Sequence, residues 1–181
     1  HFESLNIRVL RGVRAQRLDS ARRTLALSDG NTLTFDRLLI ATGSSPATPP
    51  IPGIESVGYL TSDNVWELRE LPQRLVVLGG GPIGCELTQA FARLGARVTQ
   101  VEMAPRIMLR EDPEVSELVT QRLRAEGVAV LVDHRAKEFI NDNGEKILIA
   151  EHEGKDVRIP FDAVLVAVGR AANLNGYGLE E

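Results

Sequence analysis

The stretch from residue 75 to residue 87 decides the fold: Leu75-Val76-Val77-Leu78-Gly79-Gly80-Gly81-Pro82-Ile83-Gly84-Cys85-Glu86-Leu87. Its first four residues are apolar and predict a strand that is buried on both faces. Gly79, Gly81 and Gly84 follow at the spacing GxGxxG. That spacing indicates a phosphate loop only where a strand precedes it and a helix follows.

Both flanking elements are present in the sequence. Apolar side chains recur at helical intervals over residues 83–94, at Ile83, Leu87, Ala90, Phe91 and Leu94. Gly95 is suited to ending that helix. Residues 97–102 then show a second strand pattern. The order of elements predicts a βαβ unit over residues 75–102 that binds a dinucleotide.

Each residue of the loop has a physical task in such a unit. Gly79 permits a tight turn, Gly81 lets the backbone approach the pyrophosphate, and Gly84 lets helix and strand pack closely. Pro82 removes only a donor that the first helical turn does not use. The free N–H groups of the first helical turn and the positive end of the helix would bind the phosphates. The alternative is a glycine-rich turn before an ordinary buried helix.

Glu102 ends the second strand, 18 residues beyond Gly84. An acid at this place accepts hydrogen bonds from the adenosine ribose of NAD. It also repels the 2′-phosphate of NADP, by about 4 kcal/mol for two unit charges roughly 4 Å apart at an effective dielectric near 20. Arg106 is the nearest following cation and leaves weak NADP use open. The sequence therefore predicts NAD(H) as the ligand.

The rest of the chain predicts an α/β fold that continues from this unit. The expected elements are a helix over 113–126, a strand over 128–132, a meander with turns at 141–144 and 153–154, and a strand over 164–168. Asp112 is the expected N-cap. The core face of the helix should be formed by Val115, Leu118, Val119 and Leu123. We therefore expect a Rossmann-like domain, with a parallel sheet, helices and a β-meander.

The first 43 residues repeat the pattern near the end of the chain. Phe35–Gly43 matches Phe161–Gly169 at five of nine positions, and Ile7–Leu10 matches Val128–Leu131 upstream. The expected elements are strands over 7–10, 24–27, 32–35 and 37–41, with a hairpin turn at 28–31. No βαβαβ pattern precedes this copy, and residue 1 is His. We therefore expect the chain to be a piece of a larger protein.

The segment between the two copies contains several prolines. Residues 44–53 predict an extended linker without regular structure. Residues 63–71 predict a short helix capped by Ser62 or Asp63, with Trp66 packed against the domain. Beyond it, His134 and His152 are expected to be solvated rather than catalytic.

Composition limits the classes of function. The net charge is −4, so there is no basic footprint for nucleic acid. No apolar run reaches the roughly 18 residues that a membrane helix needs, and no Cys/His pattern has zinc spacing. We expect neither a metal nor a membrane or nucleic-acid partner. The one cysteine, Cys85, excludes an internal disulfide and fits a cytoplasmic protein, in which it is expected to be a small packing residue.

Three ordered motifs resemble the FAD-dependent pyridine nucleotide–disulfide oxidoreductases, whose members include dihydrolipoamide dehydrogenase, mercuric reductase and glutathione reductase. Residues 76–97 resemble the NAD-binding domain of that family. Leu39–Ser44 resembles its ATG motif, and Val168–Asn173 resembles its GRxPN motif. The resemblance covers the whole chain.

The resemblance implies roles for particular residues. NAD would be contacted by Gly79, Gly81, Pro82, Ile83, Gly84, Glu102, Ala136 and Gly169. Thr42, Gly43 and Ser44 would touch FAD in the full-length parent. Glu86 matches the acid that lies under the nicotinamide and pairs with a lysine beside the flavin. The implied parent is a homodimer in which NADH passes a hydride to FAD and on to a redox disulfide.

The sequence also departs from the family pattern. The CxxxxC redox pair lies outside this chain, and Pro82 stands where many relatives carry a Tyr that covers the nicotinamide. The segment alone should bind NADH and catalyse little. The expected organisation is 1–45 as the β part of a truncated FAD-binding domain, 46–72 as linker and short helix, 73–169 as the NAD(H)-binding domain and 170–181 as the return to the FAD domain.

Two other functions stay open at this point. A flavoenzyme without disulfide chemistry, such as an NADH oxidase, a peroxidase or a ferredoxin reductase, shares the βαβ fingerprint. A non-catalytic nucleotide-sensing module would require residues 1–43 to form a closed lobe. The final substrate is chosen by residues outside this segment in the family.

Overall fold

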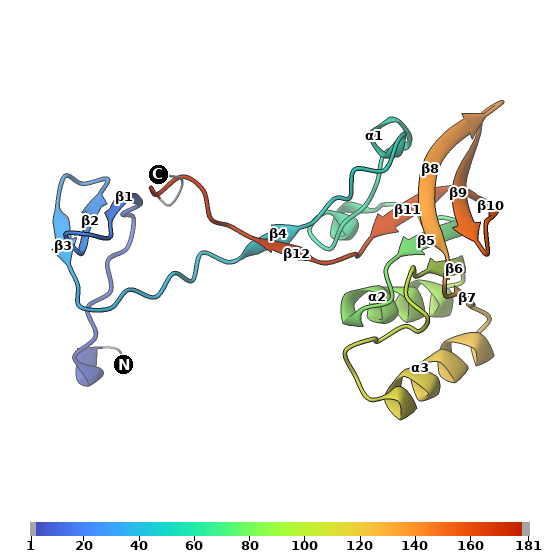
Figure 1. The fold of residues 1–181 in the computed structure, drawn as a ribbon, viewed down its shortest axis with the longest axis horizontal. Helices are drawn as coiled ribbons and strands as arrows, with labels where there is room; N and C mark the ends of the chain where they lie inside the picture. The colour runs from blue at the N-terminus through green and yellow to red at the C-terminus, as the bar shows by residue number, and fades with distance from the viewer. Residues whose placement is uncertain (1–2, 179–181) are drawn as a thin grey trace. The chain divides into compact units, whose positions relative to one another are not determined.

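The computed structural model describes residues 3–178 and divides the chain into two compact units (Figure 1). Residues 46–171 form one unit, and the segments before and after them form the other. The outermost parts of the predicted segments 1–45 and 170–181, namely residues 1–2 and 179–181, lie outside the described residues. None of the described helices is both long and apolar enough to cross a membrane.

A four-stranded parallel sheet forms the centre of the larger unit, in the order β11-β5-β6-β7. Its strands are β5 (Arg74–Leu78), β6 (Arg97–Val101), β7 (Ala129–Leu131) and β11 (Ala163–Val166), with helices α2 (Pro82–Arg93) and α3 (Pro113–Ala125) (Figure 1). In the ladders, Leu78 lies opposite both Val101 and Val166. Gly79, Glu102 and Ala167 therefore leave the sheet together at its carboxyl edge. The predicted α/β fold is confirmed.

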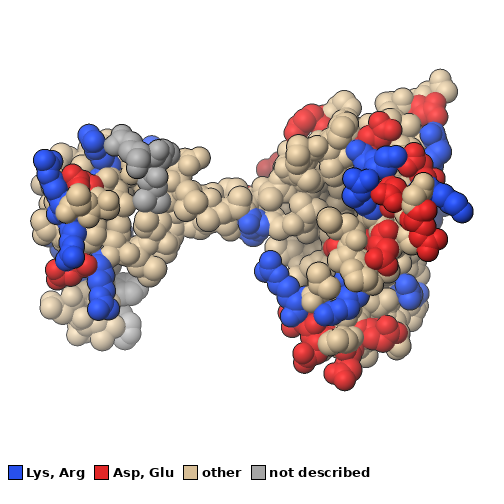
Figure 2. Space-filling model, viewed as in Figure 1, with Lys and Arg blue, Asp and Glu red and all other residues tan. Residues whose placement is uncertain are grey.

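The meander consists of β8 (Arg135–Asp142), β9 (Glu145–His152) and β10 (Lys155–Phe161), all antiparallel. Both predicted turns are present, and each places a glycine at positive φ, at Gly144 and Gly154. Phe139 and Phe161 meet edge to face, with ring centroids 5.7 Å apart, in the core shared with the sheet. Acidic and basic side chains are mixed over this part of the surface (Figure 2), and several pair across the strands: Arg135–Glu151, Lys137–Asp156 and Arg158–Asp142.

The buried face of each helix coincides only in part with the one that apolar spacing predicts: Phe91 and Leu123 are buried as predicted, and Leu87 and Val119 are partly buried. In α2 the buried residues are Gly84, Cys85, Thr88 and Phe91, while Ile83 and Leu94 are exposed. In α3, Ser116, Thr120 and Leu123 are buried, while Val115 and Leu118 are exposed. The hydroxyl of Ser116 donates to the carbonyl of Ile107 at 2.7 Å, and that of Thr120 to the carbonyl of Ser116 at 2.8 Å. These local bonds let small polar residues occupy positions expected to be apolar.

Residues 46–72 contribute more to the core than the proline pattern predicts. Helix α1 (Ile54–Val57) buries both of its terminal residues, and the 3-10 helix η2 (Val65–Glu67) buries Val65. The predicted helix over 63–71 is only this single turn, and its N-cap is Asn64. Trp66 is 72% exposed, so the packing role predicted for it is wrong. Its indole N–H donates to the carbonyl of Ser62 at 2.8 Å.

The smaller unit contains a three-stranded antiparallel sheet. It consists of β1 (Ala15–Asp19), β2 (Thr24–Leu27) and β3 (Thr32–Thr34), after the 3-10 helix η1 (Glu3–Leu5). The predicted hairpin at 28–31 is confirmed. The strands predicted over 7–10 and 37–41 are not formed, and Leu39 is 87% exposed. Their counterparts in the repeat form β7 and β11, which pair with β6 and β5. No such neighbouring strands flank the first copy among the described residues, so its strand pattern stays unpaired.

Strand β4 (Ser44–Pro46) pairs with β12 (Arg170–Ala172) in a two-stranded sheet, where a linker without regular structure was expected. Gly43 precedes β4 and has a φ of 77°. Its carbonyl accepts the amide of Asn173 at 3.0 Å. The two motifs at residues 39–44 and 168–173 are therefore bonded to each other.

Candidate dinucleotide site

A cleft of about 1070 Å³ lies at the carboxyl edge of the parallel sheet. It is lined by the loop after β5, the loop after β6, the start of β8 and the segment after β11. Predicted residues in its lining are Gly79, Gly81, Pro82, Ile83, Glu102, Ala136 and Gly169. Carboxyl edges of parallel sheets are where open α/β folds bind ligands.

The phosphate loop leaves β5 through a turn that requires glycine. Gly79 has a φ of 103°, and its amide donates to the carbonyl of Val101 at 2.9 Å. A Cβ at Gly79 would lie 2.4 Å from the carbonyl oxygen of Ala167. A Cβ at Gly84 would lie 2.3 Å from the carbonyl oxygen of Gly79. Helix α2 can therefore start directly against the end of β5 only with glycine at both positions.

The middle glycine, Gly80, stands at a position that the GxGxxG spacing leaves variable. Its amide donates to Oε2 of Glu102 at 2.6 Å, and its carbonyl accepts the amide of Met108 at 2.6 Å. An added Cβ would come within 2.7 Å of a side-chain carbon of Ile107. Gly80 thus joins the phosphate loop to the loop after β6, a contact that the sequence pattern did not reveal.

Gly81 differs from these glycines because open space surrounds it. An added Cβ meets no atom within 4 Å, and the backbone has an ordinary φ of −76°. Gly81 is the N-cap of α2, and Pro82 is the first helical residue. Helix geometry leaves the amides of Ile83 and Gly84 without intrahelical acceptors. An anion at this helix end would meet these donors and the positive end of the helix dipole.

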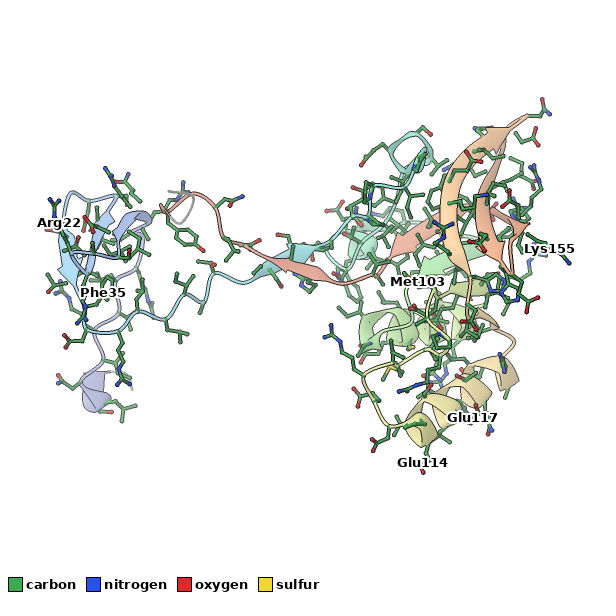
Figure 3. All side chains as sticks on the ribbon, viewed as in Figure 1. Arg22, Phe35, Met103, Glu114, Glu117 and Lys155 are labelled. Carbon is green, nitrogen blue, oxygen red and sulfur yellow. The ribbon has the colours of Figure 1, made fainter. Side chains whose placement is uncertain are left out.

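Glu102 is half-buried beside that helix end. Its Oε1 accepts the amide of Ala104 at 2.7 Å, and its Oε2 accepts the amide of Gly80. Two backbone amides therefore fix the carboxylate, and each oxygen retains a further lone pair for a ligand hydroxyl. Met103, labelled in Figure 3, follows directly and is 72% exposed at the rim of the cleft.

Arg106, the cation nearest to Glu102 in sequence, is held by its own loop. Its guanidinium donates to the carbonyls of Met108, Leu109 and Glu111 at 3.2, 2.8 and 3.0 Å. These three bonds brace the loop that contacts Gly80. The Arg106 side chain therefore stabilises its own loop. From the sequence alone, it was a possible partner for the 2′-phosphate of NADP.

Gln100 on β6 and Thr88 on α2 are fully buried polar residues that the sequence analysis did not single out, and Cys85 lies beside Gln100. Gln100 and Thr88 are 0% exposed, and Cys85 is 7% exposed. The amide Nε2 of Gln100 donates to the carbonyl of Gly79 at 3.1 Å and lies 3.5 Å from Cys85 Sγ. Burial raises the pKa of the Cys85 thiol, in line with a packing residue.

His134 is buried, so the expectation that it is solvated is wrong. Its ring stacks on that of His152 with centroids 4.1 Å apart, and its Nδ1 lies 2.6 Å from the carbonyl oxygen of Val132. The ring lines the cleft beside Ala136. The stacking on His152 and the contact with the Val132 carbonyl give the buried imidazole of His134 its partners. Its position in the sequence had suggested an exposed side chain.

The structure does not bring every predicted residue to the cleft. Glu86 is exposed on α2, and Gly84 is buried against the end of β5, so neither of them lines the cleft. Thr42 and Gly43 lie in the smaller unit, with Ser44 beginning β4. The hydroxyl of Thr42 donates to the carbonyl of Asn173 at 2.6 Å, so it is already used within the chain.

Comparison with known proteins shows which family this chain resembles. A family model described as pyridine nucleotide-disulphide oxidoreductase matches residues 2–181. A mercuric reductase of Acidithiobacillus ferrooxidans is 42% identical over 176 residues, covering 96% of this chain and 31% of that protein. The chain spans about a third of the length of such relatives.

Solved structures agree with the sequence comparison. The Cu(II) complex of the HOCl-induced flavoprotein disulfide reductase RclA from Escherichia coli aligns with a TM-score of 0.75 and 28% identity, over 92% of this chain and 37% of that one. A NAD-dependent persulfide reductase from A. fulgidus aligns with a TM-score of 0.70 and 34% identity, over 95% of this chain and 34% of that one. With a family model matched over residues 2–181 and a relative 42% identical over 96% of this chain, the chain belongs to the pyridine nucleotide-disulphide oxidoreductase family.

Proposed function

We propose that residues 46–171 bind NAD(H), and that the parent protein is a flavin-dependent oxidoreductase in which NADH delivers a hydride to FAD. The observation that carries the proposal is the open approach to Gly81 beside a fixed Glu102 carboxylate. A pyrophosphate and an adenosine ribose need these two features at one helix end. The membership of the chain in the family supports the same reading.

The residues of the cleft fit a dinucleotide. Gly81 has no Cβ where the backbone must approach a phosphate, and the amides of Ile83 and Gly84 are free to donate. Glu102 would accept the ribose hydroxyls, and Ala136 would lie near the adenine. Gly169, which also lines the cleft, would lie near the nicotinamide.

The charges at the ribose end favour NAD over NADP. Glu102 places a carboxylate there, and its two bonds to backbone amides fix the position of the side chain. Arg106 donates to three carbonyls and is not directed to a 2′-phosphate. A 2′-phosphate would therefore meet one fixed negative charge without compensation from Arg106.

The parent's further roles rest on the family alone. FAD, when bound, accepts hydride equivalents and passes electrons to a cysteine pair outside this chain. Thr42, Gly43 and Ser44 would lie against the flavin nucleotide, with Asn173 holding the first two in place. Glu86 would lie under the nicotinamide. The homodimeric state and the disulfide-type substrate belong to the same proposal.

Titration of the 181-residue chain with NADH and NADPH tests the proposal, using NADH fluorescence and calorimetry. We expect NADH to bind with a Kd below the millimolar range and NADPH to bind at least about tenfold more weakly. No binding of NADH at millimolar concentration would refute the proposal. Equal affinity for the two nucleotides would refute the argument from Glu102.

A further inference from the structure

Gln100 is a polar residue at the centre of the parallel sheet. It lies on β6, opposite Val77 of β5 and Val130 of β7, and it is 0% exposed. Buried strands of parallel sheets are ordinarily apolar on both faces. A glutamine at this position therefore calls for a specific partner for its amide.

The partner is the phosphate loop. The Nε2 group of Gln100 donates to the carbonyl of Gly79 at 3.1 Å and lies 3.5 Å from Cys85 Sγ in the first turn of α2. The Gly79 carbonyl belongs to the same peptide group as the Gly80 amide, which donates to Glu102. Gln100 and Glu102 are two residues apart and face the same side of the strand. Together they hold both ends of one peptide group.

That peptide group sets the direction of the backbone that follows it. The next residue is Gly81, which is open to the cleft, and α2 begins directly after it. A rotation of the Gly79–Gly80 peptide would turn the Gly81 amide and the first helical amides away from a bound phosphate. Glu102 prevents that rotation from the N–H end, and Gln100 prevents it from the C=O end.

The carboxamide oxygen of Gln100 indicates that this residue does not serve mainly to stabilise the fold. Its Oε1 has no hydrogen-bond partner, although it is buried. An unsatisfied buried acceptor destabilises a folded protein, and an apolar side chain of similar volume would avoid that cost. Position 100 therefore holds a residue whose unpaired Oε1 reduces stability and whose Nε2 donates to the Gly79 carbonyl of the phosphate loop.

We infer that Gln100 is a positioning residue for the pyrophosphate: through the Gly79 carbonyl it orients the amides of the phosphate loop. The inference rests on the proposed binding of NAD(H) and adds a residue to it. Gln100 should affect the binding of any ligand that carries the pyrophosphate. It should leave contacts to the adenosine moiety unchanged.

The test uses two ligands, ADP-ribose and adenosine, and the variants Gln100→Met and Gln100→Leu of the 181-residue chain. Calorimetry should give an ADP-ribose Kd about five- to tenfold higher for both variants, in keeping with loss of the hydrogen bond to the Gly79 carbonyl, and an unchanged Kd for adenosine. Both variants should melt within a few degrees of the unsubstituted chain, because removal of the unpaired Oε1 offsets loss of the donor to the Gly79 carbonyl. A merely structural role would instead lower the melting temperature and affect both ligands alike.

Thr88→Val is the matched control. Thr88 is equally buried on α2, and its hydroxyl also has no hydrogen-bond partner. This variant should bind ADP-ribose and adenosine as the unsubstituted chain does. Unchanged ADP-ribose affinity in both Gln100 variants would overturn the inference and leave the proposed function standing. Failure of the unsubstituted chain to bind ADP-ribose or NADH would overturn both.

Discussion

The carboxylate of Glu102 accepts the amide of Gly80 at 2.6 Å, although the two residues are 22 positions apart in the chain. The acid that would choose the cofactor is therefore also a structural part of the phosphate loop. Cofactor choice and loop geometry depend on one side chain, so a substitution made to change the first also disturbs the second.

The Glu102→Gln variant tests this dual role. A glutamine has one acceptor oxygen, so its NH₂ group would face the amide of either Gly80 or Ala104. We expect the NADH Kd to rise about tenfold and the melting temperature to fall, since hydrogen bonds to charged groups are stronger than neutral ones. NADPH should not reach the affinity that the unsubstituted chain has for NADH. Calorimetry and thermal unfolding measure both effects.

Glu114→Gln provides the control for that experiment. Glu114 is exposed on the first turn of α3 (Figure 3), and its substitution changes the net charge by the same amount. It should leave NADH affinity unchanged. If Glu102→Gln bound NADPH as tightly as the unsubstituted chain binds NADH, at an unchanged melting temperature, the structural role of Glu102 would be disproved.

Gly81→Ala separates ligand approach from folding. The added Cβ meets no atom of the protein within 4 Å and the backbone φ suits alanine, so the melting temperature should change little. The same methyl group stands in the way of a phosphate, and the NADH Kd should rise at least about tenfold. In Gly84→Ala the Cβ would lie 2.3 Å from the Gly79 oxygen, so stability should be lost as well. Unchanged NADH binding by a folded Gly81→Ala chain would contradict the assignment of the phosphate site.

The repeat offers a comparison of Leu39 with Leu165, which occupy the same place in its two copies. Leu165 lies on β11 and is 0% exposed, so Leu165→Ala should lower the free energy of unfolding by about 2–5 kcal/mol. Leu39 is 87% exposed, so Leu39→Ala should change it by less than about 0.5 kcal/mol. Chemical denaturation followed by circular dichroism measures both. Similar losses in the two variants would mean that the first copy forms a strand in solution.

Glu126 provides a prediction about pH. Arg93 and Arg122 contact it at 2.8 and 2.7 Å, and the hydrogen bond with Arg93 is the main reason why its pKa is lowered to about 2. A carboxylate whose pKa is lower in the folded state stabilises that state above its unfolded pKa near 4.5 and loses this effect as pH falls toward 2. Glu126→Gln should melt roughly 2 °C lower than the unsubstituted chain at pH 7. The two melting temperatures should converge between pH 4.5 and pH 2, and a constant difference would contradict this.

The sequence was sufficient for the elements that depend on local pattern. Residues 75–102 form the predicted strand, helix and strand because apolar runs, glycines and helical spacing all indicate the same structure there. The turns at Gly144 and Gly154 follow from residues that accept positive φ. These features need no knowledge of distant contacts.

The sequence failed where a partner decides the outcome. The apolar run at 37–41 has the composition of a buried strand but has no strand beside it among the described residues. The buried positions of Ser116 and Gln100 depend on single carbonyls, those of Ile107 and Gly79. The bonds of Gly80 to Glu102 and Met108 likewise arise only once separate loops meet. Hydropathy is a property of a single residue, whereas these contacts depend on which two residues meet in the folded chain.

The hydrogen bond between residues 47 and 169 bears on how the larger unit, residues 46–171, could be transferred or permuted. The amide of Ala47 donates to the carbonyl of Gly169 at 3.0 Å, so the larger unit starts and finishes at one place. A segment whose two ends meet can be transplanted into another protein as a cassette, or circularly permuted by a short linker and a new opening at the exposed turn of residues 141–144. Such an exchange would move the whole cleft as one piece, because every residue that lines it lies between residues 46 and 170.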